Sequence, residues 1–370
     1  MADIHALWLA AALPPDAPCV FRLLDCFGSP REIYEAGRES LSATGLLTGA
    51  ELRALCDKSM AGAKYIEENC RKYCVEVTHP WQEDYPPLLS HIAQPPVTLY
   101  YKGDLAALTK PLTLAVVGTR GCTPYGEGCA YDFAKALAGC GITIVSGLAE
   151  GIDAAAHRGA IEGGGRTAAV MATGHDRVYP FSNSGLYEEI LKTGGAILSE
   201  YYPECRVEKN SFVIRNRIVS GLSYGTLIAE AGERSGALAT ARHTLDQDRD
   251  LFALPGPVTS PSSKGTNGLI KSLSARAVTE PADILAEYIA LYPEKLYLPA
   301  RPAADSSAAL SRDEERLSAL LVSGGGMSPR LLLRLSGMEE HRLSETLTQL
   351  IHKGMIKKLP DGRFDRTERK

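Results

Sequence analysis

The sequence lacks several features that would place the protein at a membrane or around a metal ion. It has no run of eighteen apolar residues, so it contains no segment typical of a transmembrane helix. Its nine cysteines are scattered and form no CxxC pair, which favours free thiols in a reducing cytoplasm over zinc or disulfides. An acid, Asp3, stands where a signal peptide has lysine or arginine. We therefore expect a cytoplasmic protein with no metal, no cofactor and no membrane contact.

An excess of positive charge and the common phosphate-binding motifs are also missing. The net charge is −4, so the overall field does not attract phosphate, and any nucleic-acid contact must come from a local basic patch. No GxxxxGK[ST] occurs, and no GxGxxG follows the first strand of the predicted α/β region. A P-loop and a dinucleotide-binding fingerprint are therefore both absent.

The chain has 370 residues, which is long for one domain, and its 45% of hydrophobic residues is ordinary for globular proteins. A segment rich in proline, alanine and serine near the C-terminus has the composition of a flexible linker. We expect four parts: a helical module at 1–78, a core at 79–292, a linker at 293–311 and a small domain at 312–370.

The N-terminal module is predicted to consist of short helices. Breaks near Gly28 and at residues 44–49 separate its apolar stretches. Short helices joined by glycine-containing turns are typical of sterile-alpha-motif and helix-hairpin-helix modules. The pattern leaves two interpretations open, a packing or interaction module, which we favour, and a module that binds DNA backbone.

The core is organised around residues 114–120, LAVVGTR, an apolar run that stops at Gly118. Such a run is typical of a parallel strand covered on both faces, and the glycine allows a sharp turn before a helix from Pro124 to Gly139. Strands and helices then alternate, which predicts an α/β fold with an extended Rossmann-like, doubly wound parallel sheet. The expected strands are 97–101, 112–117, 142–146, 167–172, 196–199, 225–229, 251–254 and 276–279.

The C-terminal part resembles a winged helix. Apolar spacing predicts helices over 312–323, from Met327 onward and over 339–353, followed by a hairpin that turns at Asp361 and Gly362. The third helix mixes acidic and basic residues, which suits a protein partner better than a DNA major groove.

Four clusters of candidate binding residues follow predicted strands, where the ligand crevice of an open α/β sheet lies. Small residues and backbone amides at helix N-termini favour anions, and arginine offers a planar fork to phosphate. The candidates are Gly118, Thr119, Arg120, Ser146, Gly147, Lys209, Phe212, Arg215, Asn216, Arg217, Gly265, Thr266 and Asn267.

The segment KNSFVIRNR, residues 209–217, is the most informative of the four clusters. It places basic residues around one aromatic, Phe212, in a predicted loop. Cations that neutralise phosphates beside a ring that stacks on a base are what single-stranded nucleic acid requires. The alternative is that Phe212 is a core residue at the start of the following helix, and composition alone leaves both open.

Asp153 and His157 are four residues apart on a predicted helix, so they share a face. They could be an acid–base pair or two metal ligands, or a buried pair that shapes the preceding loop. We favour the buried pair, because no third ligand has a matching spacing.

Several of these motifs together resemble the DNA-processing protein A family, also called DprA or Smf. The matching segments are AVVGTR (115–120), IVSGLAEGIDAAAH (144–157), YPFSN (179–183), SEYYP (199–203), FVIRNRIVSGLS (212–223), ERSGALATA (233–241), FALPGPV (252–258) and SKGTNGLI (263–270). The resemblance implies a cytoplasmic homodimer without catalytic activity that binds single-stranded DNA, protects incoming strands in natural transformation and loads RecA.

The resemblance also implies residue roles. Arg120 matches the phosphate-binding arginine, Lys209 and Phe212 match the basic and base-stacking positions, and Arg215 with Asn216 matches the RNR segment. The chain departs from the family's usual pattern at Ala172 and His175, where glycine and leucine are common.

Two other functions are weaker alternatives. A nucleoside-monophosphate phosphoribohydrolase has a related fold, but its PGGxGT loop is not present, since Pro255 and Gly256 are followed by Pro257 and Val258. A winged-helix regulator would act through residues 312–370, whose mixed charge argues against it.

Overall fold

A computed structural model describes residues 3–15, 17–208, 210–296, 311–321, 326–352, 355–358 and 363–366. Its contacts divide the chain into two units, Met1–Tyr297 and Leu298–Lys370, which we describe separately. None of the described helices combines the length and apolar character that a membrane span requires. The division into four parts expected above stays a prediction.

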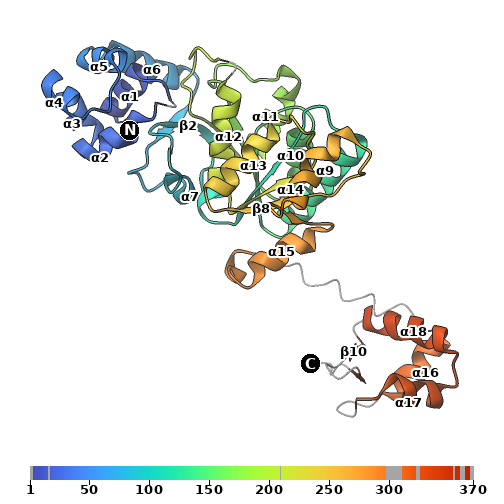
Figure 1. Ribbon diagram of the computed structural model, residues 1–370. Coiled ribbons are helices and arrows are strands. Elements are labelled where there is room, and N and C mark those ends of the chain that lie inside the picture. Colours follow the sequence, from blue (N-terminus) through green and yellow to red (C-terminus); the bar gives the residue numbers. More distant parts are fainter. Residues whose placement is uncertain are drawn as a thin grey trace. The chain divides into compact units, whose positions relative to one another are not determined.

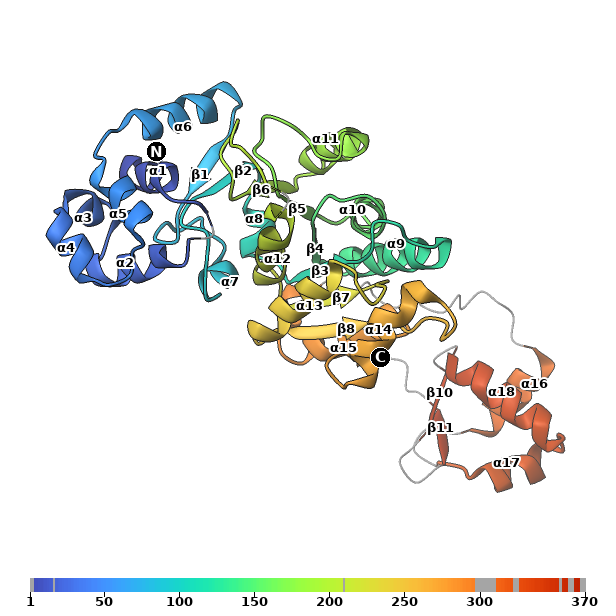
Figure 2. The same ribbon diagram turned by 45° about the horizontal axis from the view of Figure 1, so that its top comes forward.

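The first unit begins with short helices, drawn in blue in Figure 1 and Figure 2. Their apolar side chains form one cluster. Ser29 caps one helix, and Thr48 forms a capping box with Glu51 at another, which explains why this sequence breaks into separate helices. Tyr100, from the edge of the sheet, completes the cluster. The helices are α1 (Ile4–Ala12), α2 (Cys19–Phe27), α3 (Pro30–Glu35), α4 (Arg38–Ala43), α5 (Gly49–Cys56) and α6 (Ala61–Lys72).

A nine-stranded sheet follows, in the order β1-β2-β6-β5-β4-β3-β7-β8-β9. The expected strands are all present within a few residues. Residues 76–78, which we expected to end the helical module, instead form an additional edge strand. The strands are β1 (Glu76–Thr78), β2 (Leu99–Gly103), β3 (Thr113–Val117), β4 (Thr143–Ser146), β5 (Thr167–Met171), β6 (Ala196–Ser199), β7 (Gly225–Ile228), β8 (Asp250–Ala253) and β9 (Arg276–Ala277).

The prediction of a purely parallel sheet is wrong at one edge. β2 pairs antiparallel with β6, and β1 pairs antiparallel with β2, whereas the pairs from β6 to β9 are parallel. Parallel strands that follow each other in the chain are usually joined by a crossover helix, whereas antiparallel strands need none. The proline-rich segment between β1 and β2 contains only the four-residue helix α7 (Pro87–Ser90), in keeping with the antiparallel pairing of these two strands. The sheet is therefore mixed.

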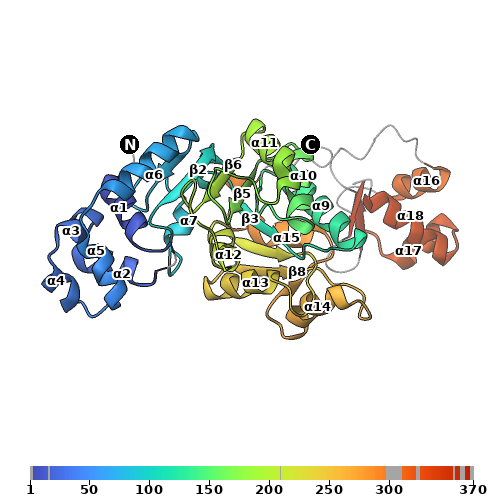
Figure 3. The same cartoon turned by 90° about the horizontal axis from the view of Figure 1, so that it is seen from above.

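Helices cover both faces of the sheet. Ala115 and Val117 of β3 belong to an apolar cluster with residues of α12 and α13, and Leu114 and Val116 belong to another with residues of α9, α10 and α15. Figure 3 shows α12, α13 and α14 along one face and α9, α10 and α11 along the other. The helices are α8 (Ala106–Thr109), α9 (Pro124–Gly139), α10 (Ile152–Glu162), η1 (Phe181–Asn183), α11 (Ser184–Lys192), α12 (Ser211–Gly221), α13 (Ala237–Asp246), η2 (Pro261–Ser263), α14 (Lys264–Lys271), α15 (Pro281–Ile289) and η3 (Pro293–Lys295).

The strand order reverses at β3. The chain runs from β3 outward through β4, β5 and β6, and later places β7 on the other side of β3 (Figure 2). In open α/β sheets such a switch point leaves a crevice beyond the carboxyl ends of the strands, where ligands bind. The loops after β3, β4 and β7 meet at this edge.

The second unit contains helices α16 (Arg312–Leu320), α17 (Pro329–Ser336) and α18 (Glu340–His352), and the antiparallel strands β10 (Ile356–Lys358) and β11 (Phe364–Arg366). Leu317, Leu332, Leu347 and Phe364 contribute to its apolar cluster. Three helices followed by two paired strands match the expected order, and the identification as a winged helix stays a prediction. The predicted turn at 361–362 and most of the predicted linker lie outside the described residues.

Candidate functional site

The loop after β3 is held by a buried carboxylate that the sequence analysis missed. Glu230, which follows β7, accepts hydrogen bonds from the Thr123 backbone amide at 2.9 Å and from its hydroxyl at 3.0 Å. Its carbonyl oxygen accepts one from the Thr119 amide at 2.8 Å. A Cβ on Gly118 would lie 2.8 Å from the same carbonyl, so only glycine fits there. A carboxylate directly after an apolar strand is the signal that could have identified Glu230.

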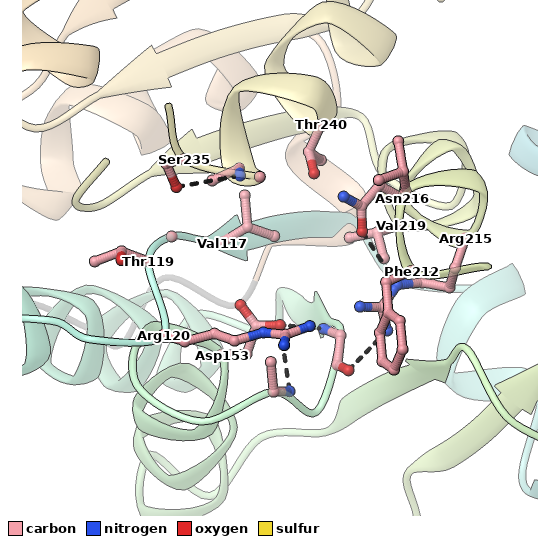
Figure 4. Close-up of a pocket in the computed structure, with 16 residues that line it drawn as sticks. Val117, Thr119, Arg120, Asp153, Phe212, Arg215, Asn216, Val219, Ser235 and Thr240 are labelled. Carbon is pink, nitrogen blue, oxygen red and sulfur yellow. Dashed lines mark hydrogen bonds between the residues drawn. The ribbon is translucent and has the colours of Figure 1, made fainter. Parts of the chain in front are cut away.

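A cavity of about 350 Å³, which we call the β3 cleft, lies at the switch point of the sheet (Figure 4). It is lined by seven of the predicted residues, namely Gly118, Thr119, Arg120, Gly147, Phe212, Arg215 and Asn216. Ser235, Gly236 and Thr240 line it as well. Gly236 is the residue before α13, and this helix N-terminus favours an anion in the cleft. The Ser235 hydroxyl accepts a hydrogen bond from the Ala237 amide at 3.3 Å.

Arg120 and Phe212 lie against each other at the cleft. The exposed Arg120 guanidinium is 5.1 Å from the centre of the Phe212 ring, within the range of a cation–π contact. Phe212 lies in the first turn of α12 rather than in the predicted loop, and it is half-buried. Neither of the two alternatives for this residue is met in full. Phe212 lies at the start of a helix, as the core alternative requires. Its ring, however, is in none of the apolar clusters that the described residues form.

A second aromatic, Tyr179, extends this pair. Its ring centre is 5.4 Å from that of Phe212, and the side chain is 51% exposed. Tyr179 and Pro180 line a smaller depression beside the cleft, together with Arg120, Phe212 and Ala172. Ala172, at a position where the family commonly has glycine, therefore lies at this site. The motif YPFSN carried Tyr179, but the sequence analysis assigned it no role.

The base of the cleft contains two buried groups of opposite charge, Arg215 and Asp153. Arg215 is 5% exposed and donates to the carbonyl oxygens of Gly147, at 2.7 Å, and Val170. The Asp153 carboxylate accepts hydrogen bonds from the amides of Gly147 and Ala149, at 3.1 and 3.4 Å. Burial raises the pKa of Asp153, and the charge of Arg215 opposes that shift. Burial lowers the pKa of Arg215 to about 10, so it remains a cation near neutral pH.

His157 lies deeper and does not face the cleft. Its Nδ1 is 2.7 Å from the Thr167 hydroxyl, which donates its own proton to the Ile144 carbonyl, so Nδ1 is the donor in the first bond. Burial and the charge of Arg215 lower the pKa of His157 to about 3. Asp153 and His157 are both buried but bond to different partners, and the described residues contain no cluster of three potential metal ligands.

Not every predicted residue reaches the cleft. Arg217 forms hydrogen bonds of 2.6 and 2.8 Å to the buried Glu200 carboxylate, and its Nε donates to the Gln94 carbonyl. The prediction that Arg217 lines the same crevice as Arg120 is therefore wrong. The physical reason is helical geometry, because residues two apart on a helix point about 200° apart, so Arg215 and Arg217 cannot share a face.

The remaining candidates support the loops. The Ser146 hydroxyl donates to the Val116 carbonyl and is fully buried. Gly265 packs against the backbone carbonyl oxygens that follow β7. The Thr266 hydroxyl donates a hydrogen bond to a backbone carbonyl at the start of its own helix, α14. The Asn267 side chain forms hydrogen bonds with the backbone amide and the backbone carbonyl of Gly256. None of the four lines the β3 cleft. Lys209 lies outside the described residues.

The fold and the site together define a class. The helix N-terminus, the exposed arginine and the two aromatic rings at the switch point place this chain among the open α/β proteins that form a ligand crevice at that point. A family model for DNA recombination-mediator protein A matches residues 76–289. The chain belongs to this family.

Curated relatives agree with this membership. The chain is 44% identical over 203 residues to Protein Smf of Escherichia coli, a match that covers 55% of this chain and 54% of that protein. It is 43% identical over 206 residues to DNA processing protein DprA of Streptococcus pneumoniae, covering 55% of this chain and 71% of that protein. The chain thus matches little more than half the length of the Escherichia coli relative.

Solved structures support the fold. That of DNA processing protein A from Streptococcus pneumoniae matches with a TM-score of 0.68 and 32% identity, covering 78% of this chain and 98% of that one. A Helicobacter pylori structure, described by its single-stranded DNA binding mode, matches with a TM-score of 0.53 and 32% identity, covering 58% and 96%.

Proposed function

We propose that this protein binds single-stranded DNA in the β3 cleft and acts in DNA processing during natural transformation. One observation carries the proposal: Arg120 lies against Phe212, and Tyr179 lies beside them. A cation over an aromatic ring, with a second ring in contact, offers one phosphate site and one stacking surface. The Helicobacter pylori relative is described by its single-stranded DNA binding mode, which supports the same ligand here.

The chemistry of the cleft favours an unpaired strand. The α13 N-terminus and Arg120 attract a phosphate, while the rings can stack only on a base whose face is free. The bases of a duplex are already stacked on each other, so a duplex offers only its backbone. Backbone contacts carry no sequence information, and stacking tolerates every base. Binding should therefore show little sequence preference.

The wider assignments rest on the family. We propose that the protein is cytoplasmic, forms a homodimer and loads RecA onto the bound strand, and that residues 312–370 form a winged-helix domain. We also propose that it binds without catalysis. Asp153 and His157, the acid–base candidates at the site, hydrogen-bond to backbone amides and to Thr167, which supports a structural role.

A binding titration at two salt concentrations tests the proposal. Labelled single-stranded and duplex DNA of equal length are compared, and the single strand should bind more tightly. Log affinity should fall with log salt at a slope of about −0.7 for each phosphate neutralised. Arg120→Ala should weaken binding, whereas Arg31→Ala, which removes an exposed arginine in α3, should not. Equal affinity for duplex, or an affinity independent of salt, would contradict the proposal.

A further inference from the structure

We infer that Phe181 is a second base-stacking position, so that a bound strand continues from Phe212 past Tyr179 to Phe181. This inference rests on the proposed function and extends it beyond the β3 cleft. Its ligand is the next base of the same single strand.

The Phe181 ring is 84% exposed. Among the described residues it belongs to no apolar cluster and forms no ring contact. A single exposed apolar side chain is common on protein surfaces and indicates nothing by itself. The position of Phe181 is what carries the inference, because the residues immediately before it line the site.

The aromatic side chains follow one another along the chain. Tyr179 and Pro180 line the depression beside Phe212, and the rings of Tyr179 and Phe212 are 5.4 Å apart. Phe181 is two residues beyond Tyr179, so their Cα atoms are at most about 7 Å apart. The ring of Phe181 is therefore within reach of a base adjacent to one that stacks at Tyr179 or Phe212.

The segment that carries Phe181 is anchored to the loop after β4. The Asn183 side-chain amide donates to the carbonyls of Leu148 and Ala149, at 2.9 and 3.1 Å, and is buried. The Ser182 hydroxyl donates to the Glu150 carboxylate at 2.7 Å. Since the backbone is already fixed, ordering it on binding costs little, which is the arrangement that favours affinity.

The charges around the segment define the path further. Glu150 lines the depression and repels phosphate, so the backbone of the strand must pass on the side of Arg120. The bases then face Phe212, Tyr179 and Phe181. A neutral aromatic face next to an acid suits a base and not a phosphate.

The test compares a single nucleotide with a longer strand on the full chain. The probes are thymidine 5′-monophosphate, whose single base can occupy only one stacking position and which is used as a competitor, and a labelled oligothymidine of about 16 nucleotides, the upper end of the site sizes of OB-fold domains that bind single strands. Phe181→Ala should weaken binding of the long probe by about 5- to 150-fold, the equivalent of one lost stack. It should leave the affinity for the mononucleotide unchanged, and Phe181→Trp should retain the affinity for the long probe.

Two comparisons separate this inference from the proposed function. Phe212→Ala should weaken binding of both probes, because it removes the first stacking surface. Leu273→Ala, which truncates a 91% exposed side chain after α14, should weaken neither. If Phe181→Ala behaves as Leu273→Ala does, or weakens both probes equally, the inference is overturned while the proposed function stands. If the wild-type chain binds neither probe, both fail.

Discussion

Arg217 and Glu200 form a buried ion pair on the side of α12 opposite to the β3 cleft. Two hydrogen bonds of 2.6 and 2.8 Å join them, and the Arg217 side chain is 8% exposed. Arg215, two residues earlier, faces the cleft instead. The helix α12 thus supplies one cation, Arg215, to the β3 cleft and a second, Arg217, to the contact with the segment that contains Gln94.

The first prediction separates these two roles. Arg217→Ala should lower the free energy of unfolding by about 3–5 kcal/mol, because it leaves a buried carboxylate without its arginine. The affinity of the folded protein for single-stranded DNA should hold. Arg120→Ala should show the opposite result. Its affinity for single-stranded DNA should fall, whereas its free energy of unfolding should change by no more than about 0.5 kcal/mol, because the side chain is exposed. Urea unfolding and a DNA titration on both variants decide, and a loss of affinity in Arg217→Ala without loss of stability would contradict the assignment.

The parallel strands could be predicted because both of their faces are covered. Apolar runs such as Leu114–Val117 then show no polar alternation, and the glycine after the run marks the turn into the cleft. The direction of β2 could not be predicted, since a single short strand carries no signal of whether its neighbour runs parallel or antiparallel. The edge of the sheet depends on tertiary pairing between Tyr100 and Ser199.

The site was predicted in part for a related reason. Gly118, Thr119 and Arg120 follow a strand directly, so their position depended only on locating that strand. The composition of the segment that holds Arg215 and Arg217 predicts a loop, and only the helical conformation in the structure shows that the two arginines point in different directions. The position of Glu230 after an apolar strand marks it as a candidate, but it is far from Thr123 in sequence, so no local pattern reveals which loop it holds.

The second prediction concerns acid pH. Burial lowers the pKa of His175 to about 4, although a weak hydrogen bond to the Tyr100 carbonyl opposes the shift. The ordinary histidine pKa is about 6.5. Below that value the unfolded chain takes up a proton that the folded chain does not, so stability falls as pH decreases from about 6.5 to 4. Each such group contributes a slope of up to about 1.4 kcal/mol per pH unit.

The variant His175→Leu tests this slope. It removes the buried titrating group, so the decrease in unfolding free energy between neutral and acidic buffer should be smaller than in the wild type. His157, whose pKa is lowered to about 3, continues to contribute in both proteins. Urea unfolding across that pH range is the measurement, with the exposed His91→Gln as the control. Identical slopes in wild type and His175→Leu would show that another group dominates.

The third prediction concerns the second unit. A chain ending after Pro302 should be soluble and should bind single-stranded DNA with unchanged affinity, because every residue that lines the β3 cleft belongs to the first unit. The first unit also has its own apolar clusters. Circular dichroism and a DNA titration check this prediction. An insoluble product, or a truncated protein that no longer binds, would show that residues 303–370 contribute to folding or to the site.

The fourth prediction distinguishes stacking from core packing at Phe212. If the ring stacks on a base, Phe212→Ala should reduce the affinity for single-stranded DNA by about 1–3 kcal/mol, and Phe212→Trp should retain it, because either ring offers a face. The stability of Phe212→Ala should change much less than the roughly 3–5 kcal/mol that truncation of a core phenylalanine costs. The half-buried ring and its contact with Arg120 support this expectation.

Phe133 offers a matched control within the same unit. Its ring is 5% exposed in the cluster around α9, so Phe133→Ala should show the full loss of stability and, in the protein that remains folded, unchanged DNA affinity. Melting curves and DNA titrations on Phe212→Ala, Phe212→Trp and Phe133→Ala then give two independent observables. If Phe212→Ala follows Phe133→Ala in both, the ring is part of the core. The stacking surface at the β3 cleft would then have to come from Tyr179 alone.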